Sequence, residues 1–371
     1  MHNEQRERAQ HALQARKIER ALFAARASVL WLSGFAPPVN LGPNPFAGGP
    51  PLIWYAGGTW TLLVMESQAA DAATSGLPLV TYPDYTIAAP ITSATNLAAV
   101  LRETTAADSA KGPIGVELHD CPAALANVLP AGSELTPIDG RLEPLRRRKT
   151  AEELALLRRN FALVAEGQRA GRAAVKPGNR EIDVWNAVES AIQAVAGRRV
   201  AVGNDCTVGY RDMNIGGWPL DLALRPGDSF ILDLSTQYGG YWSDSCATYY
   251  AGEPSARQIA MHNLAAAALE LAIDRARPGA VSGAIDAEIR RFIADAGYPV
   301  YPHHTGHGIG VTPHEEPRIV PYNRLVLEPG MVVMLEPGIY LPGETAVRLE
   351  HAVLITDGAP EVLTSHRILL C

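Results

Sequence analysis

The residues with the clearest chemical potential lie in one short stretch, HHTGHGIGVTPHEEP, which runs from residue 303 to residue 317. It holds four of the chain's ten histidines within twelve residues, and two glutamates follow the last of them. Histidines in such a group can bind a metal, act as catalytic acids and bases, or stay solvated in a loop. The choice between these roles depends on the charged groups that the fold brings to this stretch.

Four acidic residues end or begin strand-like segments in which a charge is costly. Asp233 and Glu336 follow the apolar runs FIL and VVML, and the returning segments carry a second pair of acids, Asp244 and Glu350. Burying a carboxylate without compensation is strongly unfavourable. One such acid could pair with Arg348 or take up a proton, but one arginine cannot balance four carboxylates, whereas a pair of divalent cations can.

His307 is the candidate for a fifth ligand to these cations. It lies between Gly306 and Gly308, where the backbone can approach a metal without obstruction by a side chain. A lone histidine among glycines is more often a loop residue, but the acids that need a counter-charge favour the ligand role. A carboxylate-rich site with one imidazole suits Mn²⁺, Co²⁺, Fe²⁺ or Zn²⁺. We therefore expect two divalent metal ions per chain.

An internal repeat would bring these residues together. From residue 150 on, two helix-like segments joined at a Lys/Arg-Pro-Gly stop are followed by an apolar strand, and the same order returns about a hundred residues later. The segments RPGDSFILD and EPGMVVMLE each place an acid seven residues after the proline. The repeat predicts two hairpins related by an approximate twofold axis, each presenting two carboxylates at matched positions.

The first part of the chain shows a different pattern, in which helix-like and strand-like segments alternate as in a small α/β domain. We expect a charged helix to about Ala25, a strand at SVLWLSG, and a hairpin whose strands PLIWYA and TWTLLVME flank Gly57 and Gly58. A helix at ATNLAAVLRE, a strand at GPIGVEL and a short helix from Cys121 should follow.

The boundary between the two domains is predicted near Arg148. Thr150 and Glu153 form a capping box there, in which each side chain satisfies a free amide at the start of a helix. We therefore expect an N-terminal domain over residues 1–148 and a catalytic domain over residues 149–371.

Composition indicates a globular protein and excludes several function classes. Apolar residues make up 47% of the 371 residues, which is ample for two buried cores. The net charge of −7 predicts no binding to nucleic acid or anionic lipid. No apolar run approaches the ~20 residues of a membrane span, and we expect no secretion signal. The four cysteines form no CxxC pair, which argues against a disulfide framework and favours a reducing cytoplasm.

Four segments resemble the signature segments of the pita-bread metallopeptidases, in particular the Xaa-Pro dipeptidase (prolidase) and aminopeptidase P branch: ILDLSTQYGGYWSD, HHTGHGIGVTPHEEP, LEPGIY and RLEHAV. The resemblance covers the whole chain. It implies an α/β (α+β) fold, with a pita-bread catalytic domain that has an internal pseudo-twofold axis and a smaller creatinase/prolidase-type N-terminal domain. The ligands that it implies for a dinuclear metal site are Asp233, Asp244, His307, Glu336 and Glu350.

The resemblance also implies catalytic roles. It places catalytic histidines four residues before and seven residues after the liganding histidine, at His303 and His314, and leaves His304 as a bystander. These two histidines would donate hydrogen bonds to the substrate carbonyl oxygen and the tetrahedral intermediate. Glu336 would be both a ligand and a proton shuttle to the departing amine. Arg348 would orient a metal-site carboxylate or meet substrate charge; alternatively, it is a structural partner of Asp244.

The implied activity is metal-dependent hydrolysis of short peptides by an Xaa-Pro dipeptidase or aminopeptidase, and the resemblance suggests a homodimer. Two cations would supply a water of lowered pKa as the nucleophile, so that a peptide carbonyl is attacked without a covalent intermediate.

The chain departs from the family pattern at two places. The family has a histidine shortly before the first liganding aspartate, but here no histidine lies between His119 and His262, and the matching stretch, around Gly216, is RDMNIGGWPL. Ala247 stands where an arginine is usual. Neither change removes a metal ligand, so we expect hydrolysis with an atypical substrate preference.

Two other hypotheses stay open. One is hydrolysis of a non-peptide amide, as creatinase performs on this fold without a metal. The other is a pita-bread domain that binds a partner without catalysis. The complete set of five ligands argues against the metal-free and the non-catalytic hypotheses.

Overall fold

The computed structural model describes residues 2–36, 48–88, 90, 92–108, 112–211 and 216–370, and the chain divides into two compact units, Met1–Arg146 and Arg147–Cys371. Each unit has its own core and its own sheets. No helix in the described part of the chain is both long enough and apolar enough to cross a bilayer.

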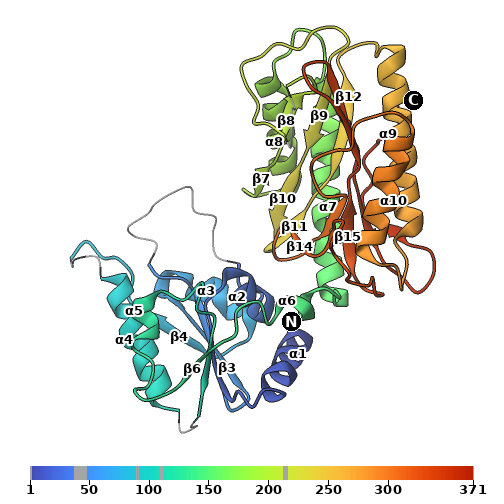
Figure 1. Ribbon diagram of the computed structural model, residues 1–371. Coiled ribbons are helices and arrows are strands. Elements are labelled where there is room, and N and C mark those ends of the chain that lie inside the picture. The colour runs from blue at the N-terminus through green and yellow to red at the C-terminus, as the bar shows by residue number, and fades with distance from the viewer. Residues whose placement is uncertain are drawn as a thin grey trace. The chain divides into compact units, whose positions relative to one another are not determined.

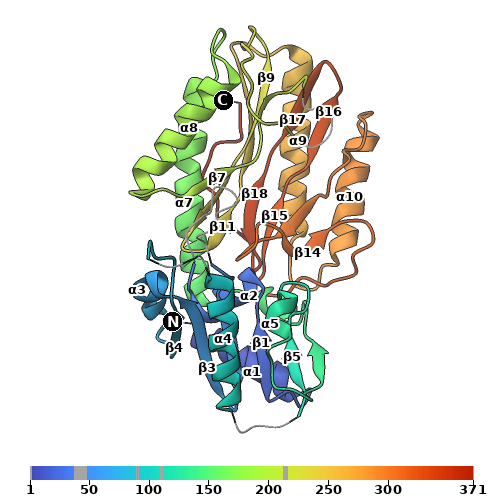
Figure 2. The ribbon, with the colours of Figure 1, turned by 90° about the vertical axis from the view of Figure 1, so that its left-hand side faces the viewer.

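The N-terminal unit contains one six-stranded sheet with the order β4-β3-β2-β1-β5-β6 (Figure 2). Its strands are β1 Arg20–Phe23, β2 Leu52–Ala56, β3 Thr59–Met65, β4 Leu79–Tyr82, β5 Ile114–Val116 and β6 Leu135–Pro137. Its main helices are α1 Asn3–Gln14, α2 Arg26–Ser33, α4 Ser93–Ala106, α5 Ala123–Ala126 and α6 Glu143–Arg146. Apolar side chains of α4 and α5 cover one face of the sheet.

Four predicted elements of this unit are confirmed. The hairpin around Gly57 and Gly58 is formed by β2 and β3, and the later helix, strand and short helix are α4, β5 and α5. Gly57 and Gly58 have φ values of 54° and 90°, which a tight turn between antiparallel strands requires. The three described cysteines are free and buried.

The strand predicted at SVLWLSG is wrong, because this segment forms helix α2. All six residues from Ser28 to Ser33 are buried, so this run has no polar face, and periodicity cannot distinguish a short buried helix from a buried strand. The strand lies earlier, at β1, and the first helix ends at Gln14 instead of Ala25. The carboxylate of Glu117 holds the start of α2 by accepting hydrogen bonds from the amides of Ala24 and Ala25 at 2.9 and 2.8 Å.

The C-terminal unit repeats one arrangement twice, as predicted. The helices are α7 Ala151–Ala174 and α8 Glu181–Ala196 in the first half, and α9 Ala256–Arg275 and α10 Ser282–Asp295 in the second. The first half also contains β7 Ala201–Gly203, β8 Cys206–Val208, β9 Ser229–Asp233, β10 Ser235–Tyr238, β11 Tyr241–Ser243 and β12 Cys246–Tyr250. The second contains β13 Gly306–Gly308, β14 Glu315–Ile319, β15 Val332–Leu335, β16 Gly338–Leu341, β17 Thr345–Arg348, β18 His351–Leu354 and β19 Glu361–Val362.

Two central sheets carry the repeat, with the orders β12-β9-β8 and β14-β13-β15-β18-β19. Figure 1 shows α7 and α8 beside the strands of the first half, and α9 and α10 beside those of the second. Helix α7 lies close to β9 because of its glycines: a Cβ atom at Gly171 would lie 2.2 Å from the Leu232 side chain. Thr150 and Glu153 form the expected capping box at the start of α7.

The register of the hairpins shows how far the repeat extends. The amide of Asp233 donates to the carbonyl of Asp205, and the amide of Glu336 donates to the carbonyl of Thr305, both at 2.9 Å. The first acids are therefore equivalent. The second acids are not, contrary to the prediction of matched positions. Cys246 lies opposite Asp233, two residues after Asp244, whereas the register of β15 with β18, continued by one residue, places Glu350 opposite Glu336. Asp244 instead comes from the connection between β11 and β12.

Candidate metal centre

The structure brings the five predicted ligands together in the C-terminal unit, and all five are buried. The Nε2 atom of His307 lies 3.6 Å from Oε1 of Glu336 and 3.8 Å from Oδ2 of Asp244. One ligand atom each from Asp244, His307 and Glu350 lie within 4.8 Å of one another, a spacing that could hold a metal ion. Asp233 joins this group through Asn204, whose amide nitrogen lies 3.2 Å from Oδ1 of Asp233 and 3.3 Å from Oδ1 of Asp244.

The strands that position these groups are buried on both faces, as predicted for β9 and β15. His307 lies in β13 between β14 and β15, opposite Met334. Its flanking glycines serve strand packing: a Cβ atom at Gly306 would lie 2.0 Å from the Met334 carbonyl oxygen, and one at Gly308 would lie 2.4 Å from that of Glu316. The glycines are therefore required by the neighbouring strands, a reason that differs from the metal access expected from the sequence.

The electrostatics of the site call for added positive charge. Burial raises the pKa values of Asp233, Asp244 and Glu350, and the neighbouring carboxylates raise them further. The Oε2 atom of Glu350 is buried and has no hydrogen-bond partner among the described residues. A buried carboxylate oxygen without a partner is costly, and a cation would satisfy it.

His307 is suited to binding a cation. Burial lowers the pKa of His307 to about 3, so the ring is neutral at pH 7. Its Nδ1 donates to the carbonyl oxygen of Gly308 at 2.9 Å, which leaves the lone pair of Nε2 directed at the acids. Four carboxylates and one neutral imidazole form the donor set that borderline divalent cations prefer. The residues present therefore match a divalent metal site.

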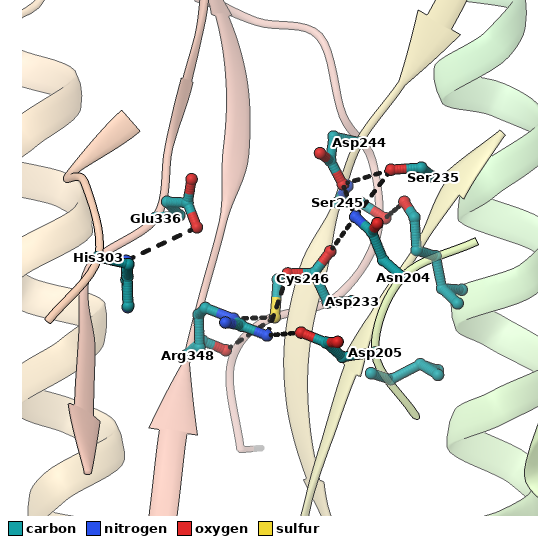
Figure 3. A network of polar contacts seen from close by, with 12 residues as sticks. Asn204, Asp205, Asp233, Ser235, Asp244, Ser245, Cys246, His303, Glu336 and Arg348 are labelled. Carbon is teal, nitrogen blue, oxygen red and sulfur yellow. Dashed lines mark hydrogen bonds and ion pairs between the residues drawn. The ribbon is translucent and has the colours of Figure 1, made fainter. Parts of the chain in front are cut away.

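Arg348 is buried and contacts two acids of the first half. Its Nη2 atom lies 2.6 Å from Oδ2 of Asp205 and 3.2 Å from Oδ2 of Asp233. Figure 3 shows the guanidinium directed toward Asp205, with Asn204, Asp233 and Asp244 on one side of the site and Glu336 and His303 on the other. The ion pair with Asp233 is the contact through which Arg348 would orient a metal-site carboxylate, and this role stays a prediction.

Sequence reasoning missed Asn204 and Asp205. Asp205 occupies the position that Thr305 has in the second half, and burial raises its pKa to about 6 although Arg348 opposes this effect. Asn204 has a φ of 81°, a left-handed conformation that asparagine tolerates better than most residues. One signal could have found them. Asn204 and Asp205 directly precede β8, the strand of the first half that corresponds in the repeat to β13, which contains His307.

The structure gives His303 partners on both ring nitrogens. Nδ1 donates to the carbonyl oxygen of His304 at 2.8 Å, and Nε2 accepts from the Tyr340 hydroxyl at 2.8 Å. Burial lowers the pKa of His303 to about 4, so the ring is neutral at pH 7. In this arrangement no ring hydrogen of His303 is directed at a substrate, and the donor role expected for it stays a prediction.

His314 and His304 differ from the expectations in opposite ways. His314 is exposed and its ring centroid lies 4.1 Å from that of His307, so it can face a substrate. Burial of part of the ring lowers the pKa of His314. The expectation that His304 is a bystander is wrong, because its Nε2 atom lies 2.8 Å from Oε1 of Glu336.

The two departures from the family pattern lie in different surroundings. Ala247 is fully buried in β12, opposite Leu232. Of the segment 214–218, Asn214 and Ile215 lie outside the described residues, whereas Gly216 and Trp218 lie within them. The side chain of Trp218 is exposed.

A buried ion pair anchors the strand that follows His314. Lys149 Nζ lies 2.8 Å from Oε2 of Glu315, and at most 2% of either side chain is exposed. Lys149→Met removes the buried cation that faces this carboxylate, and we expect it to lower the free energy of unfolding by about 3–5 kcal/mol in urea titrations. The double variant Lys149→Met/Glu315→Gln should recover part of this loss; an unchanged unfolding midpoint in Lys149→Met would contradict the assignment.

The sequence itself matches known families in both units. Residues 155–357 match Metallopeptidase family M24, and residues 5–148 match the Creatinase/Prolidase N-terminal domain. The chain therefore belongs to metallopeptidase family M24, and the resemblance and fold expected from the sequence are confirmed.

Several relatives are dipeptidases by name. The chain is 32% identical to the Xaa-Pro dipeptidase of Pyrococcus furiosus over 232 residues, which cover 62% of this chain and 67% of that protein. It is 38% identical to the probable dipeptidase PepE of Mycobacterium tuberculosis over 232 residues, 60% of each chain. The crystal structure of the prolidase from Pyrococcus horikoshii OT3 superposes with a TM-score of 0.83 at 26% identity and covers 100% of both chains.

Proposed function

We propose that this protein is a dinuclear-metal-dependent exopeptidase that hydrolyses short peptides, an Xaa-Pro dipeptidase with a relaxed preference for proline. The observation that carries the proposal is the buried group of four carboxylates and His307, in which one oxygen of Glu350 has no partner. The names of the relatives favour this activity over a non-peptide amidase or a binding protein. Residues 1–148 would form the N-terminal domain and residues 149–371 the catalytic domain.

The proposed ligands are the five residues Asp233, Asp244, His307, Glu336 and Glu350, and the ions are two of Mn²⁺, Co²⁺, Zn²⁺ or Fe²⁺ per chain. Such cations lower the pKa of a bound water and polarise the substrate carbonyl. The cytoplasm is the proposed compartment, and a homodimer is the proposed assembly.

The side chains around this site have separate tasks. The Glu336 carboxylate takes the proton of the attacking water and passes it to the nitrogen of the departing residue. His314 lies exposed beside His307 and donates its ring N–H to the carbonyl oxygen, which becomes negatively charged in the transition state. Arg348 holds Asp233 in place through their ion pair. His303 is proposed as a second donor, which requires a change in its bond with Tyr340.

The relaxed preference follows from the missing histidine before Asp233. A site that lacks one hydrogen-bonding group loses discrimination between substrates by on the order of 1 to 3 kcal/mol. We expect kcat/KM values for Ala-Ala and Leu-Leu comparable with those for Ala-Pro and Leu-Pro, measured on enzyme loaded with Mn²⁺, Co²⁺ or Zn²⁺. An Xaa-Pro tripeptide tests for aminopeptidase activity. Exclusive turnover of Xaa-Pro dipeptides would refute the relaxed preference, and no turnover of any amide would favour the binding-protein hypothesis.

A further inference from the structure

His304 links a residue outside the metal centre to one of its carboxylates. Nη2 of Arg318, on β14, lies 2.8 Å from Nδ1 of His304. Nε2 of the same ring lies 2.8 Å from Oε1 of Glu336. The three residues come from neighbouring segments, because β13, which follows His304, pairs with both β14 and β15. Arg318, His304 and Glu336 thus form a continuous polar chain.

Arg318 and Glu336 together determine which nitrogen of His304 carries the hydrogen, and Arg318 occupies the lone pair of the other nitrogen. A guanidinium group has five donors and no acceptor, so Nδ1 of His304 must accept the hydrogen bond from Arg318. The ring hydrogen then lies on Nε2, where the carboxylate of Glu336 accepts it. Neither ring nitrogen of His304 retains a lone pair that could bind a cation.

This tautomer excludes a second use of the same ring. One ring nitrogen each from His304, His307 and His314 lie within 4.8 Å of one another, which is a spacing that could hold a metal ion. Three imidazoles form a common zinc site, but each must offer a lone pair. The site shares His307 with the group of Asp244 and Glu350, so an ion bound there would compete for a ligand of the metal centre.

Hydrogen bonds to Glu316 and Asn323 fix the backbone of Arg318. Its backbone amide donates to Oε2 of Glu316 at 2.8 Å, and the side-chain amide of Asn323 donates to its carbonyl oxygen at 2.6 Å. The Asn323 amide also reaches Oε2 of Glu316 at 2.9 Å. The backbone of Arg318 is therefore held by hydrogen bonds on both its amide and its carbonyl group, and its guanidinium contacts His304 from this fixed position.

We propose that Arg318 is a positioning residue that occupies the Nδ1 lone pair of His304 and, together with Glu336, fixes its tautomer, so that His304 holds Glu336 and does not join His307 and His314 in a three-imidazole cation site. The role of Glu336 in this proposal rests on the proposed function. The tautomer and the exclusion of a further ion do not, and they are measured without substrate.

The test compares the wild type with two variants. Arg318→Met removes the hydrogen-bond donor to His304, whereas Arg318→Lys keeps a side chain that can donate hydrogen bonds and cannot accept them. Zinc titration of metal-free Arg318→Met should show an ion bound by His304, His307 and His314 at least about tenfold more tightly than in the wild type, in competition with the metal centre for His307. Excess zinc should inhibit this variant more strongly. Adding His304→Ala should remove both effects, and Arg318→Lys should behave like the wild type. Equal zinc stoichiometry and affinity in the wild type and Arg318→Met would overturn the proposal.

Two further readouts separate positioning from a structural role. In Arg318→Met at limiting zinc, kcat should fall about tenfold while KM stays near the wild-type value, because Glu336 acts after substrate binds. Nitrogen-15 NMR of the zinc-loaded wild type should show His304, assigned by its loss in His304→Ala, with hydrogen on Nε2. Hydrogen on Nδ1 would overturn the proposal even if Arg318→Met fails to fold.

Discussion

Glu350→Ala is expected to abolish peptide hydrolysis while the fold is retained. The change removes a buried ligand and should lower the rate by at least about 10³-fold, because the nucleophilic water depends on the cations for its lowered pKa. The fold should survive, since Asp244 and Glu336 both act to raise the pKa of this buried carboxylate and its loss relieves their repulsion. Asp244→Ala should behave in the same way.

The measurements are initial rates on Leu-Pro, metal content by elemental analysis and the thermal unfolding midpoint. Glu344→Ala is the matched control, because Glu344 is an exposed glutamate that pairs with Arg257 on the surface. It should keep full activity and metal content. If Glu350→Ala retains both ions and turns over substrate normally, the assignment of Glu350 as a ligand is wrong.

His314→Ala is expected to lower kcat by about 10²-fold or more while metal content stays near that of the wild type. The histidine is exposed beside His307, and a donor directed at a developing negative charge contributes mainly to the barrier. His119→Ala is the control, since His119 is an exposed histidine of the N-terminal unit. Loss of metal in His314→Ala, with normal turnover after metal is restored, would show that His314 is a ligand and not a donor.

His303→Ala is expected to lower kcat by about 10²-fold, as for His314→Ala. The variant Tyr340→Phe shows whether His303 acts on the substrate directly or through the Tyr340 hydroxyl. If His303 reaches the substrate directly, removing the Tyr340 hydroxyl should leave most of the activity. If His303 acts through that hydroxyl, the two variants should have equal defects. The 2.8 Å bond between Nε2 and the hydroxyl makes this comparison decisive.

The parts of the site that sequence could predict are those fixed by local pattern. Asp233 and Glu336 end strands so apolar that both faces had to be buried, and each carboxylate therefore needed a cation. The repeat placed these two acids in equivalent positions, and the hydrogen bonds of their amides confirm the equivalence. The ligand role of His307 was predicted from the same need for cations beside the four carboxylates.

The contacts that sequence could not predict depend on residues far apart along the chain. The pairing of Arg348 with Asp205 and the contact of His304 with Glu336 arise from the register between strands, which no local pattern specifies. The second acids illustrate the same limit: Asp244 precedes Cys246, the residue opposite Asp233, by two positions, whereas the register of β15 with β18 places Glu350 opposite Glu336. In the N-terminal unit, the uniform burial of α2 removed the periodicity that would have identified a helix.

The most direct test is the number of divalent cations that the chain must bind before it hydrolyses a dipeptide. Metal-free protein is titrated with Mn²⁺, Co²⁺ or Zn²⁺ while bound metal and the hydrolysis of Leu-Pro and Leu-Leu are followed together. We predict close to two ions per chain, activity that appears as they bind, and its loss on addition of a chelator. Protein that holds no tightly bound or restorable metal, and whose hydrolysis is insensitive to chelators, would contradict a metallopeptidase site built from these residues.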